Sequence, residues 1–480
     1  MRDSKERLYA QDYQVCVHVP TNRPHQRLCV AKEPAVPYLT PPTPIVLSSP
    51  NAILAKQVGL RFEDFYLKHS WFAYVPRYVG YSATIDASAR AAVSALESYF
   101  HRTATSARQA TRSRGEALTV LRTNLDSSDA SLMSVGLLIF AGGVVANFDI
   151  VQQAPHLDGL RAIVAARTPD TRLSDFGRYL IWQSVDKDFL LACGVGKASG
   201  WDRQSWDGLN FSTPSATTEV ATIQGLMTRL AIKVPRAIAA VRAVRGETTA
   251  RYRSANSINA RQLVDQLLGL VDSDAENTLL HRVKITSTPA SQTKRAIMPT
   301  TYSFETLDQF VAAIHYWYLR LIAIKLQLTL YTIEPGVLSD PSLPTSKTNT
   351  RAEHLTSLQA EQTRLTANII MSWQTKHSNV IDPKCRQIAL LVIWNALADM
   401  SIFRSMPSSL VRSWVLQAYQ DLHAGAEISA QNMGDTAGLF AGGPRIGMLA
   451  LEAAATTAST ISDEQERIIE TGSLQTVVLR

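Results

Sequence analysis

The chain has little cysteine, with four residues in 480, at positions 16, 29, 193 and 385. So few and so scattered thiols exclude a disulfide framework and indicate a reducing intracellular compartment. Two of them lie in CVHVPTNRPHQRLC, residues 16–29, together with two histidines. Ligand pairs of structural zinc sites are usually separated by about two to four residues, but one residue separates Cys16 from His18. We interpret this stretch as a polar, proline-bearing tail, with a zinc site and a Cys16–Cys29 redox pair as alternatives.

Long apolar runs are also missing. The strongest, residues 135–146 and 388–398, are shorter than the ~20 residues that span a bilayer, and the stretch 310–333 contains Arg320 and Lys325. The opening MRDSKERLYAQDY is charged and contains no apolar core of a secretory signal. The sequence therefore predicts a soluble protein with no membrane partner.

The excess of positive charge is small. Lysine and arginine number 48 against 41 acidic residues, a net charge of +7. This balance permits acidic partners without requiring one. Basic residues gather at 102–122 and 233–253, but no interleaved aromatic platform or recognition helix accompanies them. We interpret them as solvated helix faces, predict no DNA-binding residue and expect no direct DNA binding.

Motifs of common enzyme classes do not occur. CGVGKASG, residues 193–200, lacks the first glycine and the final Ser or Thr of a phosphate-binding loop, so it predicts a helix end or turn. G-x-S-x-G and H-E-x-x-H do not occur. The acidic clusters DSSD (126–129) and DSDAE (272–276) are typical of helix caps. We predict no catalytic residue, no metal ligand and no cofactor.

The sequence does contain helical periodicity, whereas period-two strands are nearly absent. We predict an all-α fold: a multi-helix bundle of about a dozen helices with an extended N-terminal arm. Residues 126–143 begin with side chains typical of a helix cap and are almost wholly apolar after them. This pattern predicts a central helix buried on all sides. The expected helices are residues 52–72, 87–102, 115–125, 126–143, 217–232, 259–271, 304–333, 352–373, 387–403 and 408–425.

Proline and polar residues set the expected domain boundaries. Residues 1–50 predict an extended or disordered proline-rich arm, because this stretch contains many prolines and shows no helical periodicity. Residues 51–435 predict one helical domain, interrupted by loops near 286–301 and 336–350. Residues 436–480 predict a C-terminal segment that is partly helical.

Four aromatic residues on the expected helices are candidates for lining a ligand pocket. Trp317 and Tyr318 lie in the middle of one helix, and Trp373 and Trp394 lie on later ones. Helix bundles often bind apolar ligands between their helices. The alternative is that these four residues are ordinary core.

Several motifs follow one another in a fixed order. FEDFYLKHSWFAY, ASARAAVSALESYF, RGEALTVLRTNL and SSDASLMSVGLLIFAGG precede a His156-x-x-Gly159 element, and an apolar helix with a tryptophan-containing partner follows at 384–425. This order resembles the helical regulatory domain of fungal-specific transcription factors, over about residues 50 to 430. Typical members begin with a two-zinc, six-cysteine cluster, whereas this N-terminal region has two cysteines. The resemblance therefore does not imply that this chain recognises DNA through such a cluster.

The resemblance implies a nuclear, transcription regulator-like protein without its own DNA-binding module. Such a protein would modulate fungal secondary-metabolite or related cluster genes through a protein partner, a DNA-binding factor or co-regulator, or through a small apolar ligand. The alternative is an enzyme on the same helical scaffold. It would act on an apolar biosynthetic intermediate in a pocket that includes Trp317, Tyr318 and Trp394.

Overall fold

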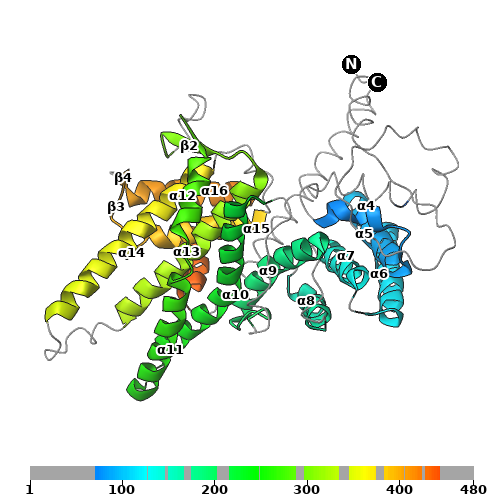
Figure 1. Cartoon of the computed structure of the whole chain (residues 1–480), viewed down its shortest axis with the longest axis horizontal. Helices are drawn as coiled ribbons and strands as arrows, with labels where there is room; N and C mark the ends of the chain where they lie inside the picture. The colour runs from blue at the N-terminus through cyan, green and yellow to red at the C-terminus, as the bar shows by residue number, and fades with distance from the viewer. Residues whose placement is uncertain are drawn as a thin grey trace, which may run out of the picture. The chain divides into compact units, whose positions relative to one another are not determined.

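The computed structural model confirms the all-α fold (Figure 1). The described residues form fourteen α-helices, two short 3₁₀ helices and two two-stranded antiparallel hairpins. The predicted arm, with Cys16, His18, His25 and Cys29, lies outside the described residues. The structure describes residues 54, 71–126, 128–145, 150–166, 174–202, 216–247, 249–287, 297–333, 345–373, 383–404, 406–423 and 428–443.

The chain divides into two compact units, and the boundary between them falls inside the predicted domain 51–435. Unit 1 comprises residues 1–148 and 162–172, and unit 2 comprises 149–161 and 173–480. The division falls within helix α8 (Ile150–Ala165). The other elements of unit 1 are η2 (Trp71–Tyr74), α4 (Val75–Tyr78), α5 (Ala83–His101), α6 (Ala104–Thr123) and α7 (Asp129–Val145).

Small side chains allow the three long helices of unit 1 to pack closely. Helix α5 contacts both α6 and α7, and its alanines 87, 89, 91, 92 and 95 are buried. Helix α7 is buried on all sides, as its apolar composition predicts. A Cβ added at Gly142 would lie 3.0 Å from a guanidinium nitrogen of Arg114, so the glycine permits a close approach.

The DSSD cluster acts as a cap, as predicted. The carboxylate of Asp126 accepts hydrogen bonds from the hydroxyls of Ser128 (2.5 Å) and Ser131 (2.6 Å). These hydroxyls, Ser128 first, lower the pKa of Asp126. The Ser128 hydroxyl in turn accepts from the backbone N–H of Ser131 at 3.3 Å, which caps the start of α7, where backbone N–H groups have no partner within the helix.

Enlarging an alanine of α5 tests this packing. Ala92 is fully buried, so Ala92→Leu forces extra methyl groups into a close helix contact. We expect the free energy of unfolding to fall by about 1–3 kcal/mol in urea denaturation. The control Ala107→Leu, on the exposed face of α6, should change it by less than about 0.5 kcal/mol. Equal effects of the two substitutions would contradict the packing described for α5.

Unit 2 is built around helix α13 (Leu307–Ile333), which contacts α10, α11, α14, α15 and η6. From residue 309 to 330, every residue except Val311 and Lys325 is buried. The other helices of unit 2 are α9 (Asp175–Val195), α10 (Thr218–Gly246), α11 (Ala250–Leu268), α12 (Ser273–His281), α14 (Thr345–Ser372), α15 (Pro383–Leu397), α16 (Ser408–Leu422), α17 (Ala430–Gly438) and η6 (Leu439–Ala441).

Several boundaries differ from the sequence prediction. Helix α10 continues to Gly246 through Pro235, which is buried, so packing outweighs the proline's lost hydrogen bond. Helix α9 was not predicted, although its end at Gly196 (φ 72°) matches the turn expected at CGVGKASG. The loop expected near 286–301 borders a hairpin of β1 (Lys284–Ser287) and β2 (Thr300–Ser303). A second short hairpin pairs β3 (Ile402–Phe403) with β4 (Met406–Pro407).

Two polar side chains of the buried helix α13, Trp317 and Arg320, donate hydrogen bonds to other helices. The indole Nε1 of Trp317 donates to the Glu276 carboxylate of α12 at 2.8 Å. Arg364 of α14 donates two hydrogen bonds to the same carboxylate, at 2.8 and 3.2 Å. The guanidinium of Arg320 donates to the Leu268 carbonyl at the end of α11, at 2.7 Å. The DSDAE cluster therefore contains both a cap, at Asp272, and a buried acceptor, Glu276.

Removing the shared acceptor tests this network. Glu276→Ala leaves the buried N–H of Trp317 without its acceptor and removes one partner of Arg364, so we expect a loss of about 2–3 kcal/mol in unfolding free energy. Chemical denaturation followed by tryptophan fluorescence measures it. The control Glu361→Ala also removes a carboxylate bonded to Arg364, but leaves the Trp317 bond intact. A control loss as large as that of Glu276→Ala would contradict the role assigned to Glu276.

Candidate functional site

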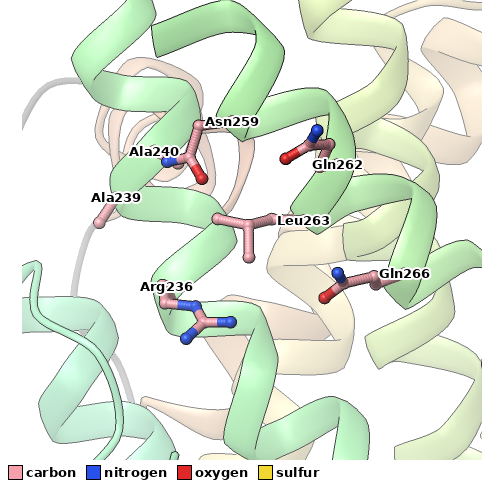
Figure 2. A pocket seen from close by; sticks show the side chains of 7 residues that line it. All are labelled: Arg236, Ala239, Ala240, Asn259, Gln262, Leu263 and Gln266. Carbon is pink, nitrogen blue, oxygen red and sulfur yellow. The ribbon is translucent and has the colours of Figure 1, made fainter.

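A hollow of about 510 Å³ lies between α10 and α11. Figure 2 shows Leu263 at its centre, between amide side chains of α11 and the α10 backbone. The amides of Asn259, Gln262 and Gln266 are exposed, and Ala239 and Ala240 are half-buried. Small residues on α10 leave the space, and amides on the facing helix make much of its wall polar.

Arg236 places a positive charge at this hollow. Its guanidinium lies 3.2 Å from the carboxylate of Asp202, whose side chain is 6% exposed. A buried carboxylate is costly unless it is paired, so this contact ties Arg236 to the segment that follows α9. The sequence prediction placed Arg236 on a solvated helix face, and its side chain is 44% exposed.

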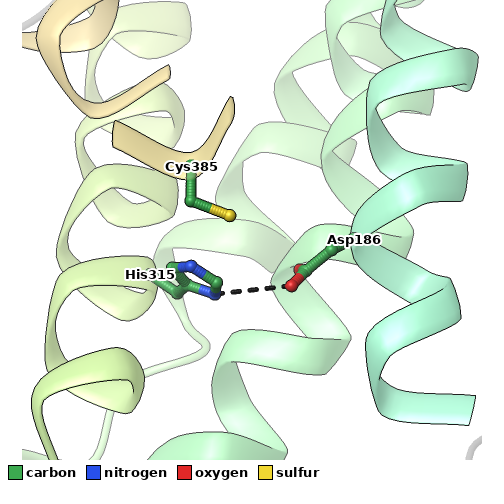
Figure 3. A group of neighbouring side chains, drawn as sticks. All are labelled: Asp186, His315 and Cys385. Carbon is green, nitrogen blue, oxygen red and sulfur yellow. Dashed lines mark ion pairs between the residues drawn. The ribbon is translucent and has the colours of Figure 1, made fainter. Parts of the chain in front are cut away.

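A second group of side chains converges inside unit 2 from three helices. Figure 3 shows Asp186 of α9, His315 of α13 and Cys385 of α15 facing one another. One ligand atom from each residue lies within 4.8 Å of the other two. The carboxylate Oδ2 of Asp186 is 3.6 Å from Nδ1 of His315. His315 and Cys385 are buried, and Asp186 is partly exposed.

The imidazole of His315 is held in an unfavourable setting for charge. Neither of its ring nitrogens has a hydrogen-bond partner among the described residues, and the ring packs against Tyr318 at 5.3 Å between centroids. Burial lowers the pKa of His315 to about 4. The Asp186 carboxylate favours the charged form of His315, but the 3.6 Å between them is too long for a hydrogen bond, and burial outweighs this attraction. At neutral pH the imidazole is therefore uncharged.

A thiol, an imidazole and a carboxylate can serve two kinds of chemistry. They are donors that bind zinc, and they are the types found in nucleophile, base and orienting roles. The second use needs a substrate to reach the sulfur, whereas Cys385 is 7% exposed. Burial therefore favours metal binding over nucleophilic attack.

The four aromatic candidates lie at positions other than the lining of the hollow. Trp317 is buried and bonded to Glu276, and Tyr318 packs on His315. The Arg412 guanidinium carbon lies 4.0 Å from the Trp394 ring centroid. Trp373 is half-buried and meets Trp414 edge to face, with ring centroids 6.3 Å apart. Their role as pocket lining stays a prediction.

The sequence analysis did not select Asp186, His315 and Cys385, because they come from separate stretches of the chain. One signal was present: His315 is a titratable residue within the apolar run FVAAIHYWYL, residues 310–319. A titratable residue on a helix that is otherwise apolar must find a partner when the helix is buried.

The chain matches no protein-family model, no curated protein and no solved structure. Among the described residues, no helix combines the length and apolar character needed to cross a bilayer. The resemblance to the fungal regulatory domain therefore rests on the sequence motifs alone.

The buried histidine predicts a specific sensitivity to acid. The pKa of His315 rises from about 4 in the folded state to its ordinary value of 6.5 on unfolding, so the unfolded state binds the extra proton. The part of the unfolding free energy that depends on neutral His315 is fully present above pH 6.5 and falls as the pH drops toward 4. The two pKa values correspond to a loss of roughly 3 kcal/mol.

Denaturation of the full chain with a chelator present, at pH 7 and at pH 4, measures this loss. We expect His315→Leu to lose roughly 3 kcal/mol less than the wild type over this range, because leucine binds no proton. The control His281→Gln replaces an exposed histidine and should leave the acid sensitivity as it is. If His315→Leu were as acid-sensitive as the wild type, the assignment of this loss to His315 would be wrong.

Proposed function

We propose that this chain is a transcription regulator-like protein that acts in the nucleus through a protein partner or a small molecule, without a DNA-binding module of its own. Two features support the proposal: the ordered helical motifs over about residues 50 to 430, and the open hollow between α10 and α11. The target genes in this proposal are those of fungal secondary metabolism or related clusters.

The hollow is the observation that carries the small-molecule part of the proposal. Its volume of about 510 Å³ lies within the range of roughly 300–1,000 Å³ that is typical of ligand sites. The amides of Gln262 and Gln266 and the guanidinium of Arg236 supply hydrogen-bond donors around the apolar Leu263. This lining suits an oxygen-bearing metabolite with a modest apolar body better than a purely apolar one.

Contacts of Arg236 and of helix α10 connect this hollow to the rest of unit 2. Arg236 pairs with the buried Asp202, so an anionic or carbonyl group that engages Arg236 competes for the guanidinium. Helix α10 also contacts α9, α12 and α13. A ligand that changes the packing of α10 would therefore affect the core helix α13. Regulation requires such a change, because a ligand shifts a conformational equilibrium only when it interacts differently with the two conformations.

A reporter experiment tests the regulatory activity. The full chain is fused to an unrelated DNA-binding domain and expressed in a fungal cell with a reporter that carries the matching site. We expect reporter transcription to change relative to the DNA-binding domain alone. The purified, unfused chain should show no tight, sequence-selective binding to duplex DNA at physiological salt. An unchanged reporter, or selective DNA binding by the unfused chain, would overturn the proposal.

Substitutions in the hollow test its part in this activity. Gln262→Leu removes a hydrogen-bonding amide, and we expect the concentration of inducing metabolite extract that gives half-maximal reporter response to rise roughly fivefold, the value of one hydrogen bond. Gln359→Leu replaces an exposed glutamine of α14 and is the matched control. The same response from Gln262→Leu and the wild type would show that the hollow is not the ligand site.

A further inference from the structure

His315 poses a problem that the rest of unit 2 does not solve. On the same helix, Trp317 and Arg320 have hydrogen-bond acceptors on neighbouring elements, while the hydroxyl of Tyr316 and the Oε1 of Gln327 have no partner among the described residues. His315 is 2% exposed, yet neither Nδ1 nor Nε2 has a hydrogen-bond partner among the described residues. Leaving a buried polar group unsatisfied costs about 1–3 kcal/mol, so such a position calls for a ligand.

The groups around His315 are a set of metal donors. We propose that Asp186, His315 and Cys385 bind a zinc ion, with each ligand supplied by a different helix (Figure 3). The site is distinct from the hollow between α10 and α11, and it does not depend on the proposed regulatory function.

The geometry suits a tetrahedral ion. With bonds of about 2.0–2.3 Å, the ligand atoms of a tetrahedral zinc site lie roughly 3.3–3.8 Å apart. The Asp186 and His315 atoms are already 3.6 Å apart, and all three ligand atoms lie within 4.8 Å of one another. Closing the set around an ion therefore needs side-chain movements of about 1 Å, not a rearrangement of helices.

Charge and donor chemistry select the ion. A thiolate and a carboxylate neutralise a divalent cation, and the neutral imidazole adds no charge, so the occupied site carries no net charge inside the protein. Sulfur and nitrogen donors favour zinc over magnesium or calcium, which prefer oxygen. Three protein ligands leave the fourth tetrahedral position for water, which the partial exposure of Asp186 permits.

Zinc binding would connect helices that the chain order keeps apart. Asp186 lies on α9, His315 on α13 and Cys385 on α15, and α13 contacts α15 directly. The unfolded chain does not hold these three groups together, so the binding free energy stabilises the folded state. An ion bound by all three residues would therefore hold α9 and α15 against α13.

Metal analysis of the full-length chain tests the site. The protein is purified without chelator, incubated with zinc, freed of excess metal and analysed for zinc by mass spectrometry. We expect one bound zinc ion per chain, and we expect its binding to require His315 and Cys385. Cobalt loaded in its place should give a thiolate-to-cobalt charge-transfer band and tetrahedral visible bands.

Matched variants make the result specific. Cys385→Ser, His315→Gln and Asp186→Asn should each lose this zinc and the cobalt bands, with affinity falling by more than the roughly 10–100-fold typical of changing an outer partner of a metal site. Cys193→Ser and His423→Gln, at buried residues outside the cluster, should keep both. Asp186→Asn changes a partly exposed residue, so it serves if the two buried substitutions prevent folding.

One further control removes the N-terminal alternative. Cys16→Ser combined with Cys29→Ser eliminates the thiols of the CVHVPTNRPHQRLC stretch and should leave the zinc of unit 2 in place. The proposal is overturned if the loaded wild type holds no zinc, if Cys385→Ser retains it, or if the N-terminal double variant loses it. Rapid alkylation of Cys385 in zinc-loaded protein would also overturn it, because a zinc-bound, buried sulfur is protected.

Discussion

The burial of helix α13 on nearly all sides is the constraint on which unit 2 depends. A helix in that position satisfies its own backbone, but each polar side chain on it must find a partner from another element or pay the cost of desolvation. Trp317 and Arg320 meet this requirement through Glu276 of α12 and the end of α11. The polar groups of α13 thus bond to α11 and α12, in addition to the apolar contacts that hold these helices together.

Three polar side chains of α13 do not meet this requirement: His315, the hydroxyl of Tyr316 and the Oε1 of Gln327 have no hydrogen-bond partner among the described residues, and His315 lies at the zinc site that we propose. A histidine on a core helix without a hydrogen bond is a cost to stability, unless it serves another purpose. Asp186 and Cys385 approach His315 from α9 and α15, so an imidazole with no partner on either ring nitrogen lies next to two further metal donors. The hollow on α10 and α11 has the opposite character, since it is open, amide-lined and next to a charge. An internal ion and a surface ligand would therefore play different parts, one holding helices together and the other responding to the surroundings.

Unit 1 buries its own central helix by different means. Helix α7 has few polar side chains, among them the buried Ser131 and Ser134, so little hydrogen bonding is required of its neighbours. Close packing stabilises this unit instead, because alanines line the buried face of α5 and Gly142 leaves room for the guanidinium of Arg114. This unit depends on side-chain size, whereas unit 2 depends on both size and polar pairing.

The sequence by itself determined the helical class, the central position of α7 and the caps at Ser128 and Asp272, because these follow from local periodicity and from side chains that bond nearby backbone. It located most helices of unit 2 but not α9 or the passage of α10 through Pro235, where packing overrides local preference. Only the tertiary structure decided which residues meet. Asp186, His315 and Cys385 belong to three separate helices, and the hollow arises where small residues of α10 face the amides of α11. Such sites depend on how distant segments pack, and periodicity along one segment carries no information about its neighbours.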